Sequence, residues 1–81
     1  MATEILIIDD NSDIRSIIND LIIDAGYTTR LAANYNQALI EIDKRLPDVA
    51  IIDVKLDKSD NDGLELLSHI KSKNKDIPVI I

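Results

Sequence analysis

The chain has 81 residues, enough for one small domain. We expect its stability to be low, because a domain of this size buries only a modest share of its surface on folding. It has no cysteine, which excludes disulfides, thiolate metal sites and cysteine nucleophiles. A formal net charge of -6 argues against direct nucleic-acid binding, and no apolar run approaches the roughly 20 residues that span a bilayer. The N-terminus shows no basic segment followed by an apolar stretch, so we expect a cytoplasmic protein with no membrane partner.

The first part of the chain alternates strand and helix patterns. Residues 4–9 form a short β-branched run, typical of a strand covered on both faces. A helix is expected next, capped by Asn11 or Ser12 and ended by Gly26. Its apolar residues recur at helical spacing, namely Ile14, Ile17, Ile18, Leu21 and Ile22. Residues 27–31 predict a second strand.

The second part repeats this alternation. A helix capped by Asn34 and ending before Pro47 has Tyr35, Ala38, Leu39 and Ile42 on one face. Residues 49–53 are another continuous apolar strand, followed by a polar loop at 57–62. A third helix starts near Gly63, and we expect Leu64, Leu67 and Ile70 to face inward. Residues 79–81, after Pro78, predict a fourth strand.

The order βαβαβαβ predicts an α/β fold with a parallel sheet, right-handed crossovers and helices on the faces of the sheet. Two apolar strand patterns end in aspartate, at Asp9-Asp10 and at Asp53. Ligands bind beyond the carboxyl ends of parallel strands, where the strand order reverses. With strand order 2-1-3-4, Asp9, Asp10 and Asp53 should line one crevice.

The pattern alone leaves two interpretations of these aspartates open. Strand-end aspartates often cap the following helix or face water. Three carboxylates so near to one another repel, so the other possibility is a cation that lies between them. Oxygen ligands at few positions suit Mg²⁺, and a carboxylate beside such a metal is a plausible phosphoryl acceptor.

Four motifs together resemble the receiver domain of bacterial two-component response regulators. They are Ile7-Ile8-Asp9-Asp10-Asn11, residues 49–53, the segment Asp62-Gly63-Leu64-Glu65-Leu66-Leu67, and Ile77-Pro78-Val79-Ile80. The resemblance covers residues 1–81 in order. It implies a flavodoxin-like doubly wound sheet and a signalling domain that is not an enzyme.

The resemblance also implies a role for each matching position. Asp53 corresponds to the phosphoacceptor and Asp10 to a direct Mg²⁺ ligand. Asp9 corresponds to a residue that acts through metal-bound water. Lys55 corresponds to the position whose backbone carbonyl completes the metal site. The implied partner is a sensor histidine kinase.

The chain departs from the family pattern in two places. Asp57 replaces a common proline, and Gly63 lies two residues later than usual, as in nitrogen-regulation-type regulators. The family also has a Ser or Thr after strand four and a Lys after strand five; these positions, strand five and helices four and five are absent from these 81 residues. If these residues act alone, we expect impaired phosphorylation, marginal stability and self-association through the first helix or strand four.

Two other functions remain as alternatives. One is a pseudo-receiver that binds partners without phosphorylation. The other is a phosphohydrolase that forms an aspartyl phosphate, although such enzymes usually separate their first two aspartates by one residue. We reject a calcium loop around Asp57–Gly63, because Lys58 and His69 would fall at ligand positions. We expect His69 at the surface or boundary. For Arg15, one turn into the first helix and near the acidic pocket, we favour a solvated helix position over an influence on partner binding or phosphate access.

Overall fold

The computed structural model describes residues 3–53 and 62–81, where strands and helices alternate along the chain. The elements are β1 (Glu4–Ile8), α1 (Ser12–Asp24), β2 (Thr28–Ala32), α2 (Tyr35–Lys44), β3 (Val49–Ile52), α3 (Asp62–Lys73) and β4 (Val79–Ile80). The predicted βαβαβαβ order is therefore confirmed. No helix in the described ranges is long and apolar enough to cross a membrane.

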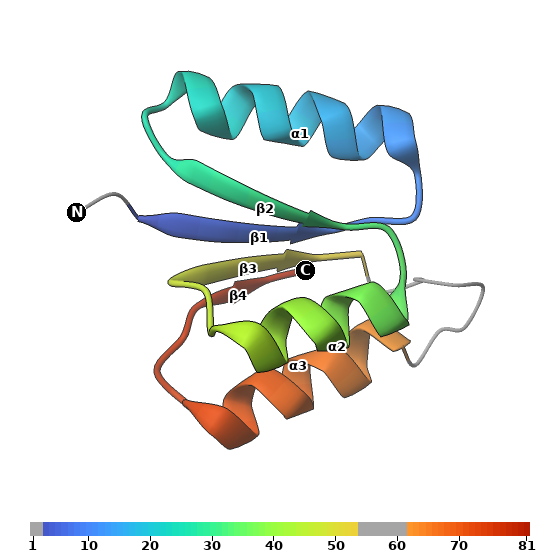
Figure 1. The fold of residues 1–81 in the computed structure, drawn as a ribbon, viewed down its shortest axis with the longest axis vertical. Helices are drawn as coiled ribbons and strands as arrows, with labels where there is room; N and C mark the ends of the chain where they lie inside the picture. The colour runs from blue at the N-terminus through green and yellow to red at the C-terminus, as the bar shows by residue number, and fades with distance from the viewer. Residues whose placement is uncertain (1–2, 54–61) are drawn as a thin grey trace.

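The strands form a parallel sheet in the order β2-β1-β3-β4, as predicted. The chain moves from β1 outward to β2, then returns past β1 to β3, so the strand order reverses between β1 and β3. Helix α1 covers one face of the sheet, and α2 and α3 lie side by side on the other (Figure 1). This is the predicted doubly wound arrangement, and it places the carboxyl ends of β1 and β3 next to each other.

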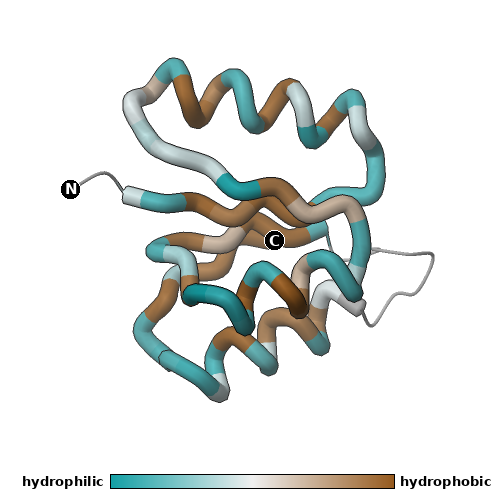
Figure 2. The backbone as a smooth tube through the Cα atoms, viewed as in Figure 1, coloured by the Kyte–Doolittle hydropathy of each residue, from teal (hydrophilic) through white to brown (hydrophobic). Residues whose placement is uncertain are grey.

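The main core lies between the sheet and the α2–α3 layer. Side chains from alternate strand positions meet side chains from the two helices there, and Figure 2 shows the apolar strands at the centre. The most deeply buried members are Leu6, Ile8, Ala32, Ala38, Ile42, Ala50, Ile52, Leu66 and Ile70. Each large aliphatic side chain buried in this way stabilises the fold by roughly 1.5–3 kcal/mol.

Helix α3 presents a different face to the core from the one we predicted. Leu66 and Ile70 are fully buried and Leu67 is half-buried, but Leu64 is 47% exposed. The prediction for Leu64 was wrong, because Leu64 lies two residues before Leu66 and so about 200° away around the helix. Ile70 faces inward, as expected, and shares the buried stripe with Leu66.

Helix α1 has the predicted helical spacing, but much of its apolar face is open. Asn11 caps its start, and Gly26, with a φ of 95°, follows its end in a conformation that favours glycine. No residue of α1 is fully buried, and Ile17 and Leu21 are 56% and 65% exposed. The helix is therefore attached to the sheet by partly buried contacts.

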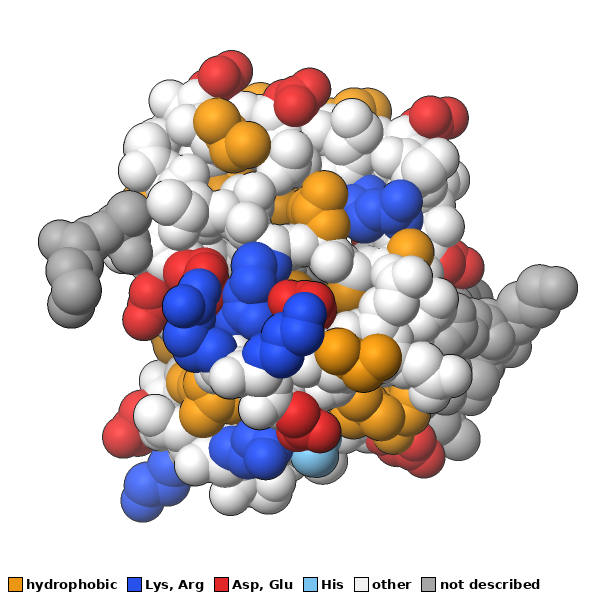
Figure 3. All heavy atoms as spheres, in the orientation of Figure 1, with side chains coloured by type: hydrophobic (Ala, Val, Ile, Leu, Met, Phe, Trp, Pro, Cys, Tyr) orange, Lys and Arg blue, Asp and Glu red, His pale blue; other side chains and the backbone are white. Residues whose placement is uncertain are grey.

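An ion-pair cluster joins β1, β2 and α2 at the end of the sheet where β1 begins. The Arg30 guanidinium lies 3.0 Å from Glu4 and 3.2 Å from Glu41, while Arg45 pairs with Glu4 and Lys44 with Glu41. Basic and acidic side chains gather on one face of the molecule in Figure 3. The hydrogen bond from Arg45 lowers the pKa of Glu4, and that from Lys44 lowers the pKa of Glu41. These charges hold together segments that are far apart in sequence.

Candidate functional site

Aspartates gather at the carboxyl ends of the two central strands. Asp9 and Asp10 directly follow β1, and Asp53 directly follows β3. The register pairs Ile8 with Ile52, and the Asp53 N–H donates to the Ile8 carbonyl at 2.9 Å. One carboxylate oxygen from each aspartate lies within 4.8 Å of those of the other two. The structure thus brings together all three aspartates that the strand pattern selected.

The turn between β1 and α1 fixes the orientation of Asp9. The Asn11 N–H donates to the Asp9 Oδ1 at 2.9 Å, while the Asn11 Oδ1 accepts from the N–H groups of Asp13 and Ile14 at 2.9 and 3.1 Å. Asn11 therefore caps the helix and binds the Asp9 carboxylate at the same time. The positive end of the α1 dipole also lies near the acidic cluster, which favours negative charge there.

A groove of about 450 Å³ opens beside the three aspartates. Its walls are apolar side chains of α1, of the strands and of the residue after β4, among them Ile14, Ile18, Ile51 and Ile81. Asp9 and Asp53 are half-buried, whereas Asp10 is exposed. The acidic cluster is therefore open to water on one side and bounded by hydrocarbon on the other.

The charge and ligand chemistry of this cluster fit a divalent metal ion. All the candidate ligand atoms are carboxylate oxygens, which are the ligands that Mg²⁺ prefers. Mg²⁺ typically takes one or two carboxylates and keeps several waters, and the exposed side of the cluster leaves room for them. Lys55, the fourth expected ligand position, lies outside the described residues.

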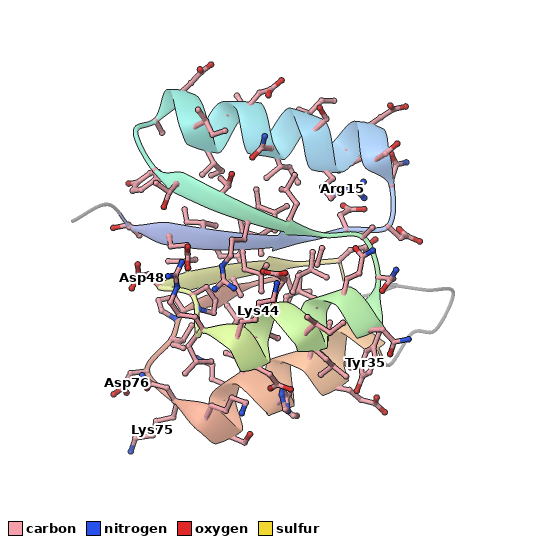
Figure 4. All side chains as sticks on the ribbon, viewed as in Figure 1. Arg15, Tyr35, Lys44, Asp48, Lys75 and Asp76 are labelled. Carbon is pink, nitrogen blue, oxygen red and sulfur yellow. The ribbon has the colours of Figure 1, made fainter. Side chains whose placement is uncertain are left out.

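Arg15 does not occupy the solvated position that we predicted. Its Nη1 donates to the backbone carbonyl of Asp9 at 2.7 Å, and its side chain is half-buried. Figure 4 shows Arg15 reaching from α1 toward the strands. Sequence reasoning gave Arg15 no structural role, because the spacing of six residues from Asp9 is not a recognised pairing. The only sequence feature that pointed to such a role was the place of Arg15, one turn into the helix that follows Asp9-Asp10.

His69 lies away from the acidic cluster. It is half-exposed on α3, and its Nε2 lies 3.2 Å from the Asp43 Oδ1 of α2. The Lys73 Nζ lies 3.5 Å from the same oxygen. The boundary position predicted for His69 is confirmed, and among the described residues it belongs to no cluster suited to a metal ion.

Comparisons with known proteins agree with this architecture. The model of the response regulator receiver domain matches residues 5–81. The nitrogen assimilation regulatory protein NtrX of Azorhizobium caulinodans is 41% identical over all 81 residues, which are 18% of its length. The sporulation initiation phosphotransferase F of Bacillus subtilis is 40% identical over the same residues, which are 64% of its length.

Solved structures have the same fold. NtrX from Brucella abortus superposes with a TM-score of 0.86 at 39% identity, over 98% of this chain and 18% of that one. The chemotaxis response regulator CheY4 of Vibrio cholerae gives a TM-score of 0.87 at 30% identity, over 98% and 66%. This chain spans less than two thirds of each of these relatives. With the family model matching almost its full length, the chain belongs to the response regulator receiver domain family.

Proposed function

We propose that Asp53 accepts a phosphoryl group and that Mg²⁺ assists the transfer. The observation that carries this proposal is the approach of the Asp9, Asp10 and Asp53 carboxylates to within 4.8 Å at the ends of β1 and β3, in a chain of the receiver family. Of these three aspartates, Asp53 is the one that follows β3, and the groove reaches it. Receiver domains are signalling domains, and we do not propose an enzyme.

The chain's residues have distinct roles in this proposal. Asp10 and Asp53 would bind Mg²⁺ directly, Asp9 would act through a metal-bound water, and the backbone carbonyl of Lys55 would complete the site. When bound, Mg²⁺ offsets the negative charge of the carboxylates and of the incoming phosphoryl group. Asp9 is already oriented by the Asn11 N–H, so less ordering is needed on binding.

The transfer is a displacement at phosphorus. A carboxylate oxygen of Asp53 forms a bond to the phosphorus of a phosphohistidine, while the phosphorus–nitrogen bond breaks and the imidazole leaves. The product is an acyl phosphate on Asp53. The partner that carries the phosphohistidine would be a sensor histidine kinase.

The proposal is tested by phosphorylating the 81-residue chain and locating the product. The chain is incubated with Mg²⁺ and acetyl phosphate and weighed by intact mass spectrometry, and the acyl phosphate is then reduced with borohydride, which converts the modified aspartate to homoserine. Because we expect impaired phosphorylation when these 81 residues act alone, the modification should be slow and incomplete, but it should fall on residue 53, depend on Mg²⁺ and be absent from Asp53→Asn. Asp20→Asn, on the exposed side of α1, is the control and should be modified like the unaltered chain.

Two other results would contradict the proposal. Modification at another residue, or modification that persists in Asp53→Asn, would show that Asp53 is not the acceptor. Mg²⁺ binding with no modification by acetyl phosphate or by a phosphorylated kinase domain would favour the pseudo-receiver alternative instead.

We also propose that isolated chains associate. Helix α1 exposes large apolar residues, including Ile17 and Leu21, and β4 pairs only with β3 in the described sheet. An exposed apolar face and a strand edge both favour pairing between chains.

A further inference from the structure

Arg15 is attached to the β1–α1 turn at two points. Its backbone N–H donates to the Asn11 carbonyl at 2.9 Å, as the first turn of α1 requires. Its guanidinium donates to the Asp9 carbonyl at 2.7 Å. The two bonds span the turn that carries Asp10, so one residue holds both sides of the Asp9–Asn11 segment.

The Asp9 carbonyl lies just beyond the sheet pairing, so its hydrogen-bond donor comes from the Arg15 guanidinium. The Asp9 N–H pairs with the Ala32 carbonyl of β2, and the Asp9 carboxylate accepts from the Asn11 N–H. On the β3 side, the Asp53 N–H bonds to Ile8. The sheet pairing therefore stops before the Asp9 carbonyl, and the half-buried guanidinium supplies its donor.

We propose that Arg15 is a positioning residue for the metal site, and that it sets the direction in which Asp9 and Asp10 face Asp53. The assignment rests on the proposed function, since it concerns the same acidic site. Arg15 acts through the main chain of Asp9 and does not bind the metal ion itself. Groups that hold metal ligands from outside in this way commonly change metal affinity by about tenfold or more.

The sign of one substitution separates positioning from simple charge. A guanidinium near three carboxylates repels a divalent cation, so if Arg15 acted only as a charge, its removal would tighten Mg²⁺ binding. If it positions the turn, its removal loosens Asp9 and Asp10 and weakens Mg²⁺ binding. Arg15→Met keeps much of the apolar stem and removes both the donor and the charge, so it distinguishes the two cases.

The experiment measures Mg²⁺ binding to the 81-residue chain by calorimetry. We expect Arg15→Met to weaken binding about tenfold, and Arg15→Lys, which keeps a donor and the charge, to restore most of the affinity. Lys75→Met removes the same charge from an exposed site between α3 and β4, well away from Arg15 (Figure 4), and should change binding little. Equal or tighter binding by Arg15→Met would overturn the proposal.

A second measurement needs no metal. In the presence of EDTA, amide hydrogen exchange at the Asn11 N–H should be faster in Arg15→Met than in the unaltered chain. The Gln37 N–H donates to the cap residue Asn34 at the start of α2 and serves as the control for global unfolding. Its exchange rate should be the same in Arg15→Met and in the unaltered chain. If Arg15→Met unfolds, Arg15→Gln is used in its place. The glutamine side chain is shorter than that of arginine, so its amide cannot reach the Asp9 carbonyl in the same way.

The two measurements keep the proposals apart. An unaltered chain that binds no Mg²⁺ would overturn the proposed function, while exchange at Asn11 still decides whether Arg15 holds the turn. An unaltered chain that binds Mg²⁺, combined with unchanged Asn11 exchange in Arg15→Met, would overturn the role of Arg15 alone.

Discussion

The acidic cluster predicts that replacing Asp10 with asparagine stabilises the metal-free protein. Coulomb's law gives about 0.9 kcal/mol for one pair of unit charges 4.8 Å apart in water. Asp10 takes part in two of the three pairs, and salt at about 0.1 M screens each by roughly 40% over this distance. Asp10→Asn should therefore raise the free energy of unfolding by about 1 kcal/mol. We use the dielectric constant of water because Asp10 is exposed.

The assay is thermal unfolding followed by circular dichroism, with and without Mg²⁺. For a domain of this size, about 1 kcal/mol corresponds to a rise in Tm of roughly 4–8 °C in EDTA. Mg²⁺ at about ten times its Kd should stabilise the unaltered chain by about 1.4 kcal/mol and Asp10→Asn by much less. The advantage in melting temperature that Asp10→Asn has in EDTA should therefore be largely lost when Mg²⁺ is added.

Asp20→Asn makes the same change of charge on the exposed surface of α1 and should move the unfolding free energy by less than about 0.5 kcal/mol. An Asp10→Asn protein that melts at or below the unaltered chain in EDTA would show that repulsion between the carboxylates does not outweigh the other interactions of Asp10. A Tm difference that is the same with and without Mg²⁺ would show that Asp10 is not a metal ligand.

Three further predictions concern stability and association. Because Arg45 lowers the pKa of Glu4, the ionised Glu4 carboxylate stabilises the fold at pH values above its unfolded pKa of about 4.3. This stabilisation is lost as the pH falls through the lower pKa that Glu4 has in the folded protein. Glu4→Gln should therefore make stability in urea less dependent on pH in this acid range. Ile70→Ala should cost about 2–5 kcal/mol in urea unfolding and Leu64→Ala less than about 1 kcal/mol, and equal losses would contradict the buried face of α3. Leu21→Lys should shift the chain toward monomer in light scattering, whereas an unchanged mass would exclude this part of α1 as the contact.

Local patterns were sufficient to predict the frame of the site. Asp9 and Asp53 end two continuous apolar strands, and parallel pairing at matching positions brings such ends together wherever they lie in sequence. Asn11 was one of two candidate caps. The structure shows that its side chain caps the helix, while its backbone N–H donates to the Asp9 carboxylate. Gly26 follows a helix end in the left-handed conformation, as expected.

Other features depend on information that spacing does not contain. The bond from Arg15 to the Asp9 carbonyl depends on one side-chain conformation and on an acceptor that lies beyond the sheet pairing. The choice of Leu66 over Leu64 depends on how α3 is rotated against α2, and both residues fit an apolar stripe in the sequence. The contacts of Arg30 with Glu4 and Glu41 join segments separated by long stretches of chain, so they appear only after the sheet has formed.

The pairing of Ile8 with Ile52 also has a consequence for folding kinetics. The proposed ligands follow strands whose paired residues are separated by 44 positions, so the proposed metal site cannot form until this long chain segment has closed. An unfolded chain therefore has no preformed site, and Mg²⁺ binding at the proposed site would report that β1 and β3 are already paired. If that pairing completes late in folding, Mg²⁺ should slow unfolding and leave the folding rate nearly unchanged, which makes the ion a kinetic marker for the last step in assembling the centre of the sheet.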